Sequence, residues 1–171
     1  MRTIRILGIT LAMTIALISS PQANATQNVS ATKQNSSLYN FTATTVDGKT
    51  IQGKSLEGKA TVLWFWAPWC TICRGESPDL VALSKSFKGR INLVGVAGLG
   101  PLNDMKKFIK DTHTGNFFHI ADVSGAIWNH FQIVSQPSFI FITKSGTSYR
   151  IVGAMSKSDL FSITSDITKK A

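Results

Sequence analysis

Hydrophobic and polar positions along this chain form patterns that predict both strands and helices. Thr61 to Trp66 is an unbroken run of mostly β-branched and aromatic residues, TVLWFW, which is typical of a strand buried on both faces of a sheet. Ile91 to Ala97 is a second run of this kind. Between the two runs, Leu80, Leu83 and Phe87 recur at helical spacing, so the pattern predicts a strand, a helix and another strand.

Further strands, turns and helices are predicted over the rest of the chain. Phe41–Val46 and Lys49–Ile51 flank Asp47-Gly48, a pair that strongly favours a tight hairpin turn. Pro101 opens a helix, and its apolar face is Leu102, Met105, Phe108 and Ile109. The later expected elements are a short strand at Phe117–Ile120, a short helix marked by Ile127, Trp128 and Phe131, and strands at Ser138–Ile142 and Ser148–Val152 around the turn Lys144-Ser145-Gly146.

A last helix begins at Ser156, with Asp159 in a capping-box position. Its inner face is Leu160, Ile163 and Ile167. Strands first alternate with helices and then form a terminal hairpin covered by a helix. This order predicts an α/β sandwich, in which a mixed central sheet is flanked by helices and carries an N-terminal β-hairpin extension.

Residues 1–25 have the three-part layout of a secretory signal peptide. Arg2 and Arg5 precede a mostly apolar run from Ile6 to Ile18, and Ala23-Asn24-Ala25 supplies small residues for cleavage after Ala25. The alternative is an uncleaved membrane anchor, but a spanning helix needs about 18 or more apolar residues and this run is shorter. We therefore expect an exported protein that is secreted, periplasmic or held in the cell envelope, without stable membrane insertion after cleavage.

Residues 26–37 are polar and without periodicity, which predicts a flexible tether before a domain at 38–171. The chain has 171 residues, 43% of them hydrophobic, which suits one globular domain. Its net charge of +9 is scattered, and the only adjacent basic pairs are Lys106-Lys107 and Lys169-Lys170. Nucleic-acid binding would require a clustered basic stripe, so the charge indicates a solvated basic surface.

The only two cysteines, Cys70 and Cys73, lie just after the first buried strand and at the start of the following helix. Unpaired N–H groups at a helix N-terminus favour the thiolate of the first cysteine, which is the reactive form. The second cysteine lies one turn along on the same face and can attack a mixed disulfide formed by the first. Strand–turn–helix placement of a Cys-x-x-Cys pair therefore indicates redox chemistry.

Two alternatives account for the pair without catalysis. A structural disulfide would close a very short loop and stabilise little. A zinc site would need two further ligands from His113, His119 and His130, which are not paired at ligand spacing. We therefore expect no metal and no cofactor.

The segment Trp66-Ala67-Pro68-Trp69-Cys70-Thr71-Ile72-Cys73 resembles the active-site motif of thioredoxin-fold oxidoreductases. The following Arg74-Gly75-Glu76-Ser77-Pro78 resembles the extracytoplasmic TlpA/ResA/DsbE-like branch, and the run Leu63-Trp64-Phe65-Trp66 is similar to secreted actinobacterial DsbE/DsbF-like proteins. The resemblance covers about Tyr39 to Ile167. It implies a thioredoxin-like three-layer sandwich.

The resemblance also implies roles for individual residues. Cys70 would be the attacking thiol and Cys73 the resolving thiol. Pro137 matches the family's cis-proline and would present the Gln136 backbone to an extended client. Glu76 can serve as the proton acceptor for the buried thiol, or it can be a solvated acid in the first turn of the helix. Trp66 and Trp69 would form an apolar platform, with at least one of them in the core.

Two positions depart from the family pattern. Thioredoxin has a buried carboxylate six residues before its first cysteine, where this chain has Trp64, so proton transfer to Cys73 needs another group. The pair Thr71-Ile72 between the cysteines supplies no imidazole to stabilise a thiolate, which argues against a strong oxidant.

The sequence thus predicts an extracytoplasmic thiol–disulfide oxidoreductase that exchanges the Cys70–Cys73 disulfide with cysteines of exported proteins, as an oxidant of folding proteins. Two alternatives stay open: a reductant of apocytochrome or other envelope disulfides, and a non-catalytic thioredoxin-fold module that binds a ligand or carries a metal. Expected partners are exported client proteins and a redox partner that resets the pair. We expect a monomer.

Overall fold

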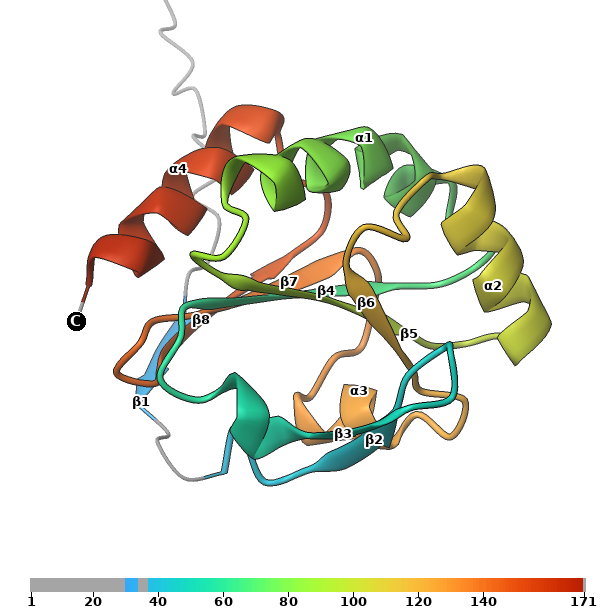
Figure 1. Ribbon diagram of the computed structural model, residues 1–171, viewed down its shortest axis with the longest axis horizontal. Coiled ribbons are helices and arrows are strands. Elements are labelled where there is room, and N and C mark those ends of the chain that lie inside the picture. The colour runs from blue at the N-terminus through green and yellow to red at the C-terminus, as the bar shows by residue number, and fades with distance from the viewer. Residues whose placement is uncertain (1–29, 34–36, 171) are drawn as a thin grey trace, which may run out of the picture.

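The computed structural model describes residues 30–33 and 37–170. A six-stranded sheet with the order β1-β8-β7-β4-β5-β6 runs through its middle (Figure 1). β4 is parallel to β5 and β5 to β6, whereas the other neighbours are antiparallel. The strands are β1 (Ser30–Lys33), β4 (Thr61–Trp66), β5 (Asn92–Ala97), β6 (Phe118–Ala121), β7 (Ser138–Ile142) and β8 (Thr147–Val152).

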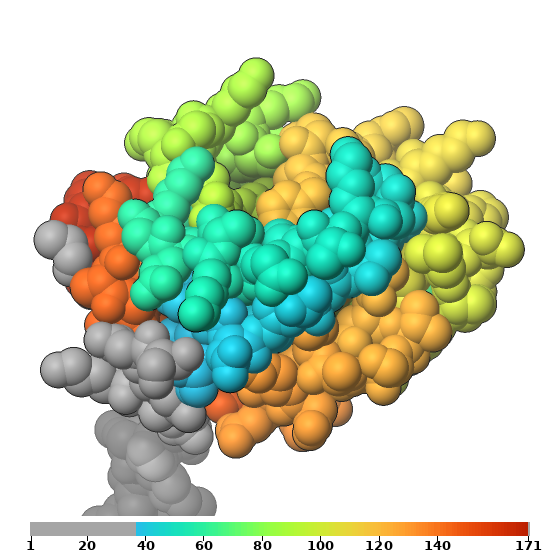
Figure 2. Space-filling model, turned by 60° about the horizontal axis from the view of Figure 1, so that its bottom comes forward, coloured from blue at the N-terminus to red at the C-terminus, as the bar shows by residue number. Residues whose placement is uncertain are grey.

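Helices and a small hairpin cover the two faces of this sheet. One face carries α1 (Thr71–Ser86), α2 (Leu102–Asp111) and α4 (Lys157–Lys169) (Figure 1). The other face carries α3 (Ala126–His130), the 3-10 helix η1 (Gly53–Leu56) and the hairpin of β2 (Thr42–Thr44) and β3 (Thr50–Gln52). Figure 2 shows the hairpin segment spread over this second face beside the α3 segment. The result is the expected three-layer, thioredoxin-like sandwich with an N-terminal hairpin.

The alternating side chains of β4 divide the core into two hydrophobic clusters. Val62, Trp64 and Trp66 point into the cluster beneath α1, α2 and α4. Leu63 and Phe65 point into the cluster beneath α3 and the hairpin. All six residues of β4 are buried, because a central strand with both faces covered has no solvated side. This is why the run has no polar alternation.

The predicted elements are confirmed with small shifts at their ends, and Ser156 caps α4 through a hydrogen bond from the Asp159 N–H. Two predicted helix faces were wrong in part. Leu102 on α2 is exposed, because it occupies the first position of the helix. Thr164 lies on the buried face of α4, and its hydroxyl is satisfied by donating to the Leu160 carbonyl.

The expected tether at 26–37 is wrong for part of its length. Ser30–Lys33 forms β1, which pairs antiparallel with β8 from Ser30↔Arg150 to Lys33↔Thr147. An edge strand presents unpaired backbone groups that another segment can bind without a hydrophobic pattern of its own. The expected signal peptide at 1–25 lies outside the described residues. Among the residues that are described, no helix is both long and apolar enough to cross a membrane.

Candidate active site

A disulfide joins Cys70 and Cys73 at the start of α1. Cys70 is the N-cap residue of the helix, and its Sγ accepts a hydrogen bond from the Cys73 N–H at 3.0 Å. Cys73 is completely buried, whereas Cys70 keeps 6% of its surface exposed. An incoming sulfur can therefore reach Cys70 but not Cys73, and the free N–H groups of the helix would stabilise a Cys70 thiolate.

The register of the sheet brings Pro137 to the same end of the molecule as the cysteines. β7 begins at Ser138, which pairs with Phe65 near the end of β4, and β4 leads directly into the Cys70 segment. The Gln136–Pro137 peptide bond is cis, as the resemblance implied. The Pro137 carbonyl accepts a hydrogen bond from the Gly153 N–H at 2.9 Å.

The two tryptophans expected to flank the disulfide have different environments. Trp69 is 62% exposed and its indole Nε1 donates to the Leu99 carbonyl at 2.9 Å. Trp66 is completely buried, and its ring stacks on Phe108 with 4.2 Å between ring centroids. Trp69 alone can therefore contact a client, while Trp66 belongs to the core under the site.

Glu76 is buried rather than solvated. Only 8% of its surface is exposed, although it lies in a helix whose outer face is in water. Its Oε1 accepts a hydrogen bond from the Met155 N–H at 2.8 Å. Burial raises the pKa of the carboxyl to about 7, against smaller lowering effects of Met155 and Trp64. The group therefore changes its protonation near neutral pH, one helical turn from the buried Cys73 sulfur.

The second oxygen of Glu76 faces the residue that replaces the strand carboxylate of thioredoxin. Glu76 Oε2 and Trp64 Nε1 are both buried without a hydrogen-bond partner of ordinary geometry. The indole is nevertheless close enough to lower the pKa of the carboxyl. In this chain the buried acid lies on α1, and an indole donor occupies the strand position at which thioredoxin has its carboxylate.

The sequence suggested His119 only as a possible zinc ligand, and its burial next to Trp66 could not be predicted from the sequence. Trp66 Nε1 donates to His119 Nδ1 at 3.2 Å, so His119 carries its proton on Nε2 and donates it to the Thr114 carbonyl at 3.0 Å. The ring fits because Gly95, its partner on β5, has no side chain, and a Cβ there would collide with His119 Nδ1. Gly95 and His119 are far apart in the sequence and become neighbours only through the pairing of β5 with β6.

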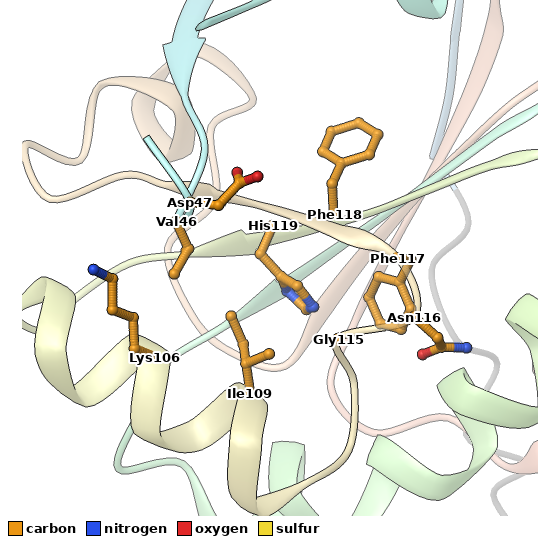
Figure 3. A pocket seen from close by; sticks show the side chains of 9 residues that line it. All are labelled: Val46, Asp47, Lys106, Ile109, Gly115, Asn116, Phe117, Phe118 and His119. Atoms are coloured by element: carbon orange, nitrogen blue, oxygen red, sulfur yellow. The ribbon is translucent and has the colours of Figure 1, made fainter. Parts of the chain in front are cut away.

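His119 also lines a pocket of about 660 Å³ between α2, β6 and the hairpin turn. In Figure 3 its ring points from β6 toward Ile109 of α2, with Val46 and Asp47 of the hairpin above and Lys106 on the far side. Neither cysteine lines this pocket. The hydrogen bond from Trp66 joins His119 to the hydrophobic cluster that contains both cysteines.

We predict that protonation of His119 destabilises the protein in acid. Burial lowers its pKa to about 4, whereas an unfolded histidine has its ordinary value near 6.5. Between these values the unfolded chain binds the proton and the folded chain does not, so the free energy of unfolding falls as pH drops from 6.5 to 4, by about 3 kcal/mol. Urea unfolding at several pH values measures the effect.

The measurement compares the pH dependence of the free energy of unfolding between variants. This is necessary because Glu76, whose pKa is raised, increases stability as pH falls over part of the same pH range. His119→Gln should lose the His119 contribution to the acid slope, while His113→Gln, at an exposed position, should keep the wild-type slope. Identical slopes in wild type and His119→Gln would contradict the prediction.

Comparisons with known proteins agree with this geometry. The AhpC/TSA family matches residues 35–150. The soluble secreted antigen MPT53 of Mycobacterium tuberculosis is 32% identical over 123 residues, 70% of each chain. The structure of MTB DsbF superposes with a TM-score of 0.76 at 34% identity, over 78% of this chain and 99% of that one.

A second solved structure is a secreted M. tuberculosis disulfide oxidoreductase homologous to Escherichia coli DsbE. It has a TM-score of 0.73 and 33% identity, again over 78% of this chain and 99% of that one. These relatives share the fold, and this chain carries a Cys-x-x-Cys disulfide at the start of its first long helix. The chain belongs to the AhpC/TSA family and is a thiol–disulfide oxidoreductase of the DsbE type.

Proposed function

We propose that this protein acts outside the cytoplasm as an oxidant, which transfers its Cys70–Cys73 disulfide to cysteine pairs of exported proteins. The observation that carries the proposal is the position of Cys70 Sγ, which caps α1 and accepts the Cys73 N–H. This environment stabilises the Cys70 thiolate of the reduced protein. A disulfide whose reduced form is stabilised is a better oxidant.

Two independent features support action outside the cytoplasm. Residues 1–25 have the layout of a cleavable export signal. MPT53 is a soluble secreted antigen, and the DsbE homologue of M. tuberculosis is a secreted protein. We therefore assign the clients to exported proteins, whose cysteines form disulfides in oxidising compartments.

The transfer proceeds in two exchange steps. A client thiolate attacks Cys70 Sγ, the Cys70–Cys73 bond breaks, and Cys73 leaves with the bonding electrons as a thiolate. A second client thiolate then attacks the client sulfur of the mixed disulfide, and Cys70 leaves as a thiolate. The client loses two electrons and gains a disulfide, while the protein becomes a dithiol. A separate redox partner that carries a disulfide or another two-electron acceptor must reset it.

Other residues of the site assist these steps. Protonated Glu76 supplies the proton that the Cys73 thiolate takes up in the first step, and it accepts that proton again when the pair is reoxidised. An extended client segment lies along Gln136 and Pro137, and its backbone forms hydrogen bonds with the Gln136 backbone. Trp69 covers the client cysteine from the other side.

The direction of exchange is tested by the reduction potential, measured by equilibration with glutathione redox buffers. For an oxidant we expect a reduction potential well above that of thioredoxin, about −270 mV. Because Thr71 and Ile72 supply no imidazole, the potential should stay below that of DsbA, about −120 mV. The oxidised protein should also introduce disulfides into a reduced, unfolded client faster than it loses them. A potential near −270 mV together with preferred reduction of client disulfides would instead identify a reductant.

A further inference from the structure

The loop between β5 and α2 holds a leucine in an unusual conformation, in contact with the tryptophan that precedes Cys70. Leu99 has a φ of 55°, in the left-handed region that bulky residues avoid. Its side chain is nevertheless 53% exposed, so burial of that side chain does not compensate for the strain. Strained residues of this kind concentrate at functional sites.

Close contacts on both sides keep Leu99 in this conformation. A Cβ on Gly98 would lie 2.6 Å from the Trp128 indole, and a Cβ on Gly100 would lie 2.8 Å from the Pro68 ring. The Gly98 N–H donates to the Trp66 carbonyl at 3.0 Å. Because the loop packs this tightly against its neighbours, its backbone cannot shift to relax Leu99.

A further hydrogen bond connects Leu99 to the residue that precedes the reactive cysteine. Trp69 Nε1 donates to the Leu99 carbonyl at 2.9 Å, and both side chains are largely exposed. Ile72, between the cysteines, is 56% exposed. We call Trp69, Ile72 and Leu99 the apolar wall. None of the three carries a charge.

The charged residue that follows Cys73 does not contribute to this wall. Arg74 is directed toward α2, where its guanidinium lies 4.9 Å from the centroid of the Phe108 ring and 3.7 Å from Asp111. A client sulfur that attacks Cys70 must come within bonding distance of it. The client residues next to that sulfur therefore pass over the apolar wall and not over an ion.

We propose that Leu99 is a specificity-determining residue, which selects clients with an apolar side chain beside the reacting cysteine. The occupant of the wall is an extended segment of an unfolded exported protein, since a folded protein has already buried such side chains. Small thiols carry no neighbouring side chain that could lie on the apolar wall, so we expect their exchange to be independent of Leu99. The inference rests on the proposed exchange with exported proteins.

The test uses substitutions that remove the side chain without straining the backbone. Glycine and asparagine both tolerate a left-handed φ, so Leu99→Gly and Leu99→Asn should keep the fold. The assay measures oxidation of two dithiol peptides. One has leucine and the other has serine beside the first cysteine, and they are otherwise identical. We expect kcat/KM for the leucine peptide to fall about tenfold, with little change for the serine peptide or for dithiothreitol.

The matched control is His113→Gly, at an exposed position with the same φ of 55° at the end of α2. It relieves the same backbone strain far along the chain from the disulfide and should leave the peptide preference unchanged. An unchanged preference in both Leu99 variants would overturn the inference, and so would an equal loss with all three substrates. If the wild-type protein oxidised neither peptide, the proposed function itself would fail.

Discussion

Replacing Cys73 with serine should trap client proteins on Cys70 as mixed disulfides, and turnover should fall to the uncatalysed background. Cys73 is the only group of the described residues that can release a client by attacking its bond to Cys70, because the two sulfurs are already joined in the oxidised protein. When Cys70 attacks a client disulfide, removal of Cys73 leaves this step intact and blocks release of the client from Cys70. In the oxidising direction the variant has no Cys70–Cys73 disulfide to transfer, so turnover stops. A binding module that does not exchange disulfides would form no adduct.

The adducts are detected by mass spectrometry under non-reducing conditions, in two arms. In one arm the Cys70 thiolate of Cys73→Ser attacks a client disulfide and releases a client thiol. In the other arm Cys70 is first activated as its nitrothiobenzoate disulfide, and a reduced client with a single cysteine displaces the chromophore. Cys70→Ser is the control, because its remaining thiol is completely buried and should form no adduct. Equal adducts from both variants would contradict the assignment of Cys70 as the attacking thiol.

Replacing Glu76 with glutamine should slow exchange about 100-fold near pH 7 and remove the inflection at that pH. The pKa of the carboxyl is raised to about 7 by burial, so it can donate or accept a proton where the enzyme works. General acid–base groups contribute about 10²- to 10⁴-fold. Glutamine keeps a carbonyl oxygen for the Met155 N–H, so the contact between α1 and the segment before α4 should survive.

The stability of the same variant provides a second readout. Folded Glu76 holds its proton up to about pH 7, whereas the unfolded group loses it near its ordinary value of about 4.3. Wild-type stability therefore decreases as pH rises from about 4.3 to about 7, and Glu76→Gln should be more stable than wild type at pH 8 by up to about 3 kcal/mol. Faster unfolding of the variant at that pH would indicate a structural role only.

Asp79→Asn is the matched control for Glu76, since it also removes an acid from α1. Asp79 raises the pKa of Glu76 slightly by repulsion, so this variant should keep the inflection and move it to a lower pH. If Glu76→Gln kept the wild-type pH profile, the proton of Cys73 would have to travel through another group.

Much of the fold could be predicted because its signals are local. The unbroken run of β4, the Asp47-Gly48 turn and the Ser156 cap each depend on a few neighbouring residues, and each is present as expected. The reactive pair is local in the same sense, since strand, turn and helix are consecutive. The strand β1 has no such signal, because its pairing comes from the free edge of β8 rather than from its own polar sequence.

The residue pattern alone predicts an α/β sandwich, the place of Cys70 at a helix N-terminus and the chemistry that follows from it. The burial of Glu76 depends on tertiary contacts, because Met155, which donates to it, is 79 residues away along the chain. The same holds for Leu99, whose exposure beside Trp69 depends on packing of Gly98 and Gly100 against distant rings. Burial raises the pKa of Glu76, and close packing holds the Leu99 backbone at a positive φ. Both effects come from residues that are distant in the sequence, so the sequence pattern does not reveal them.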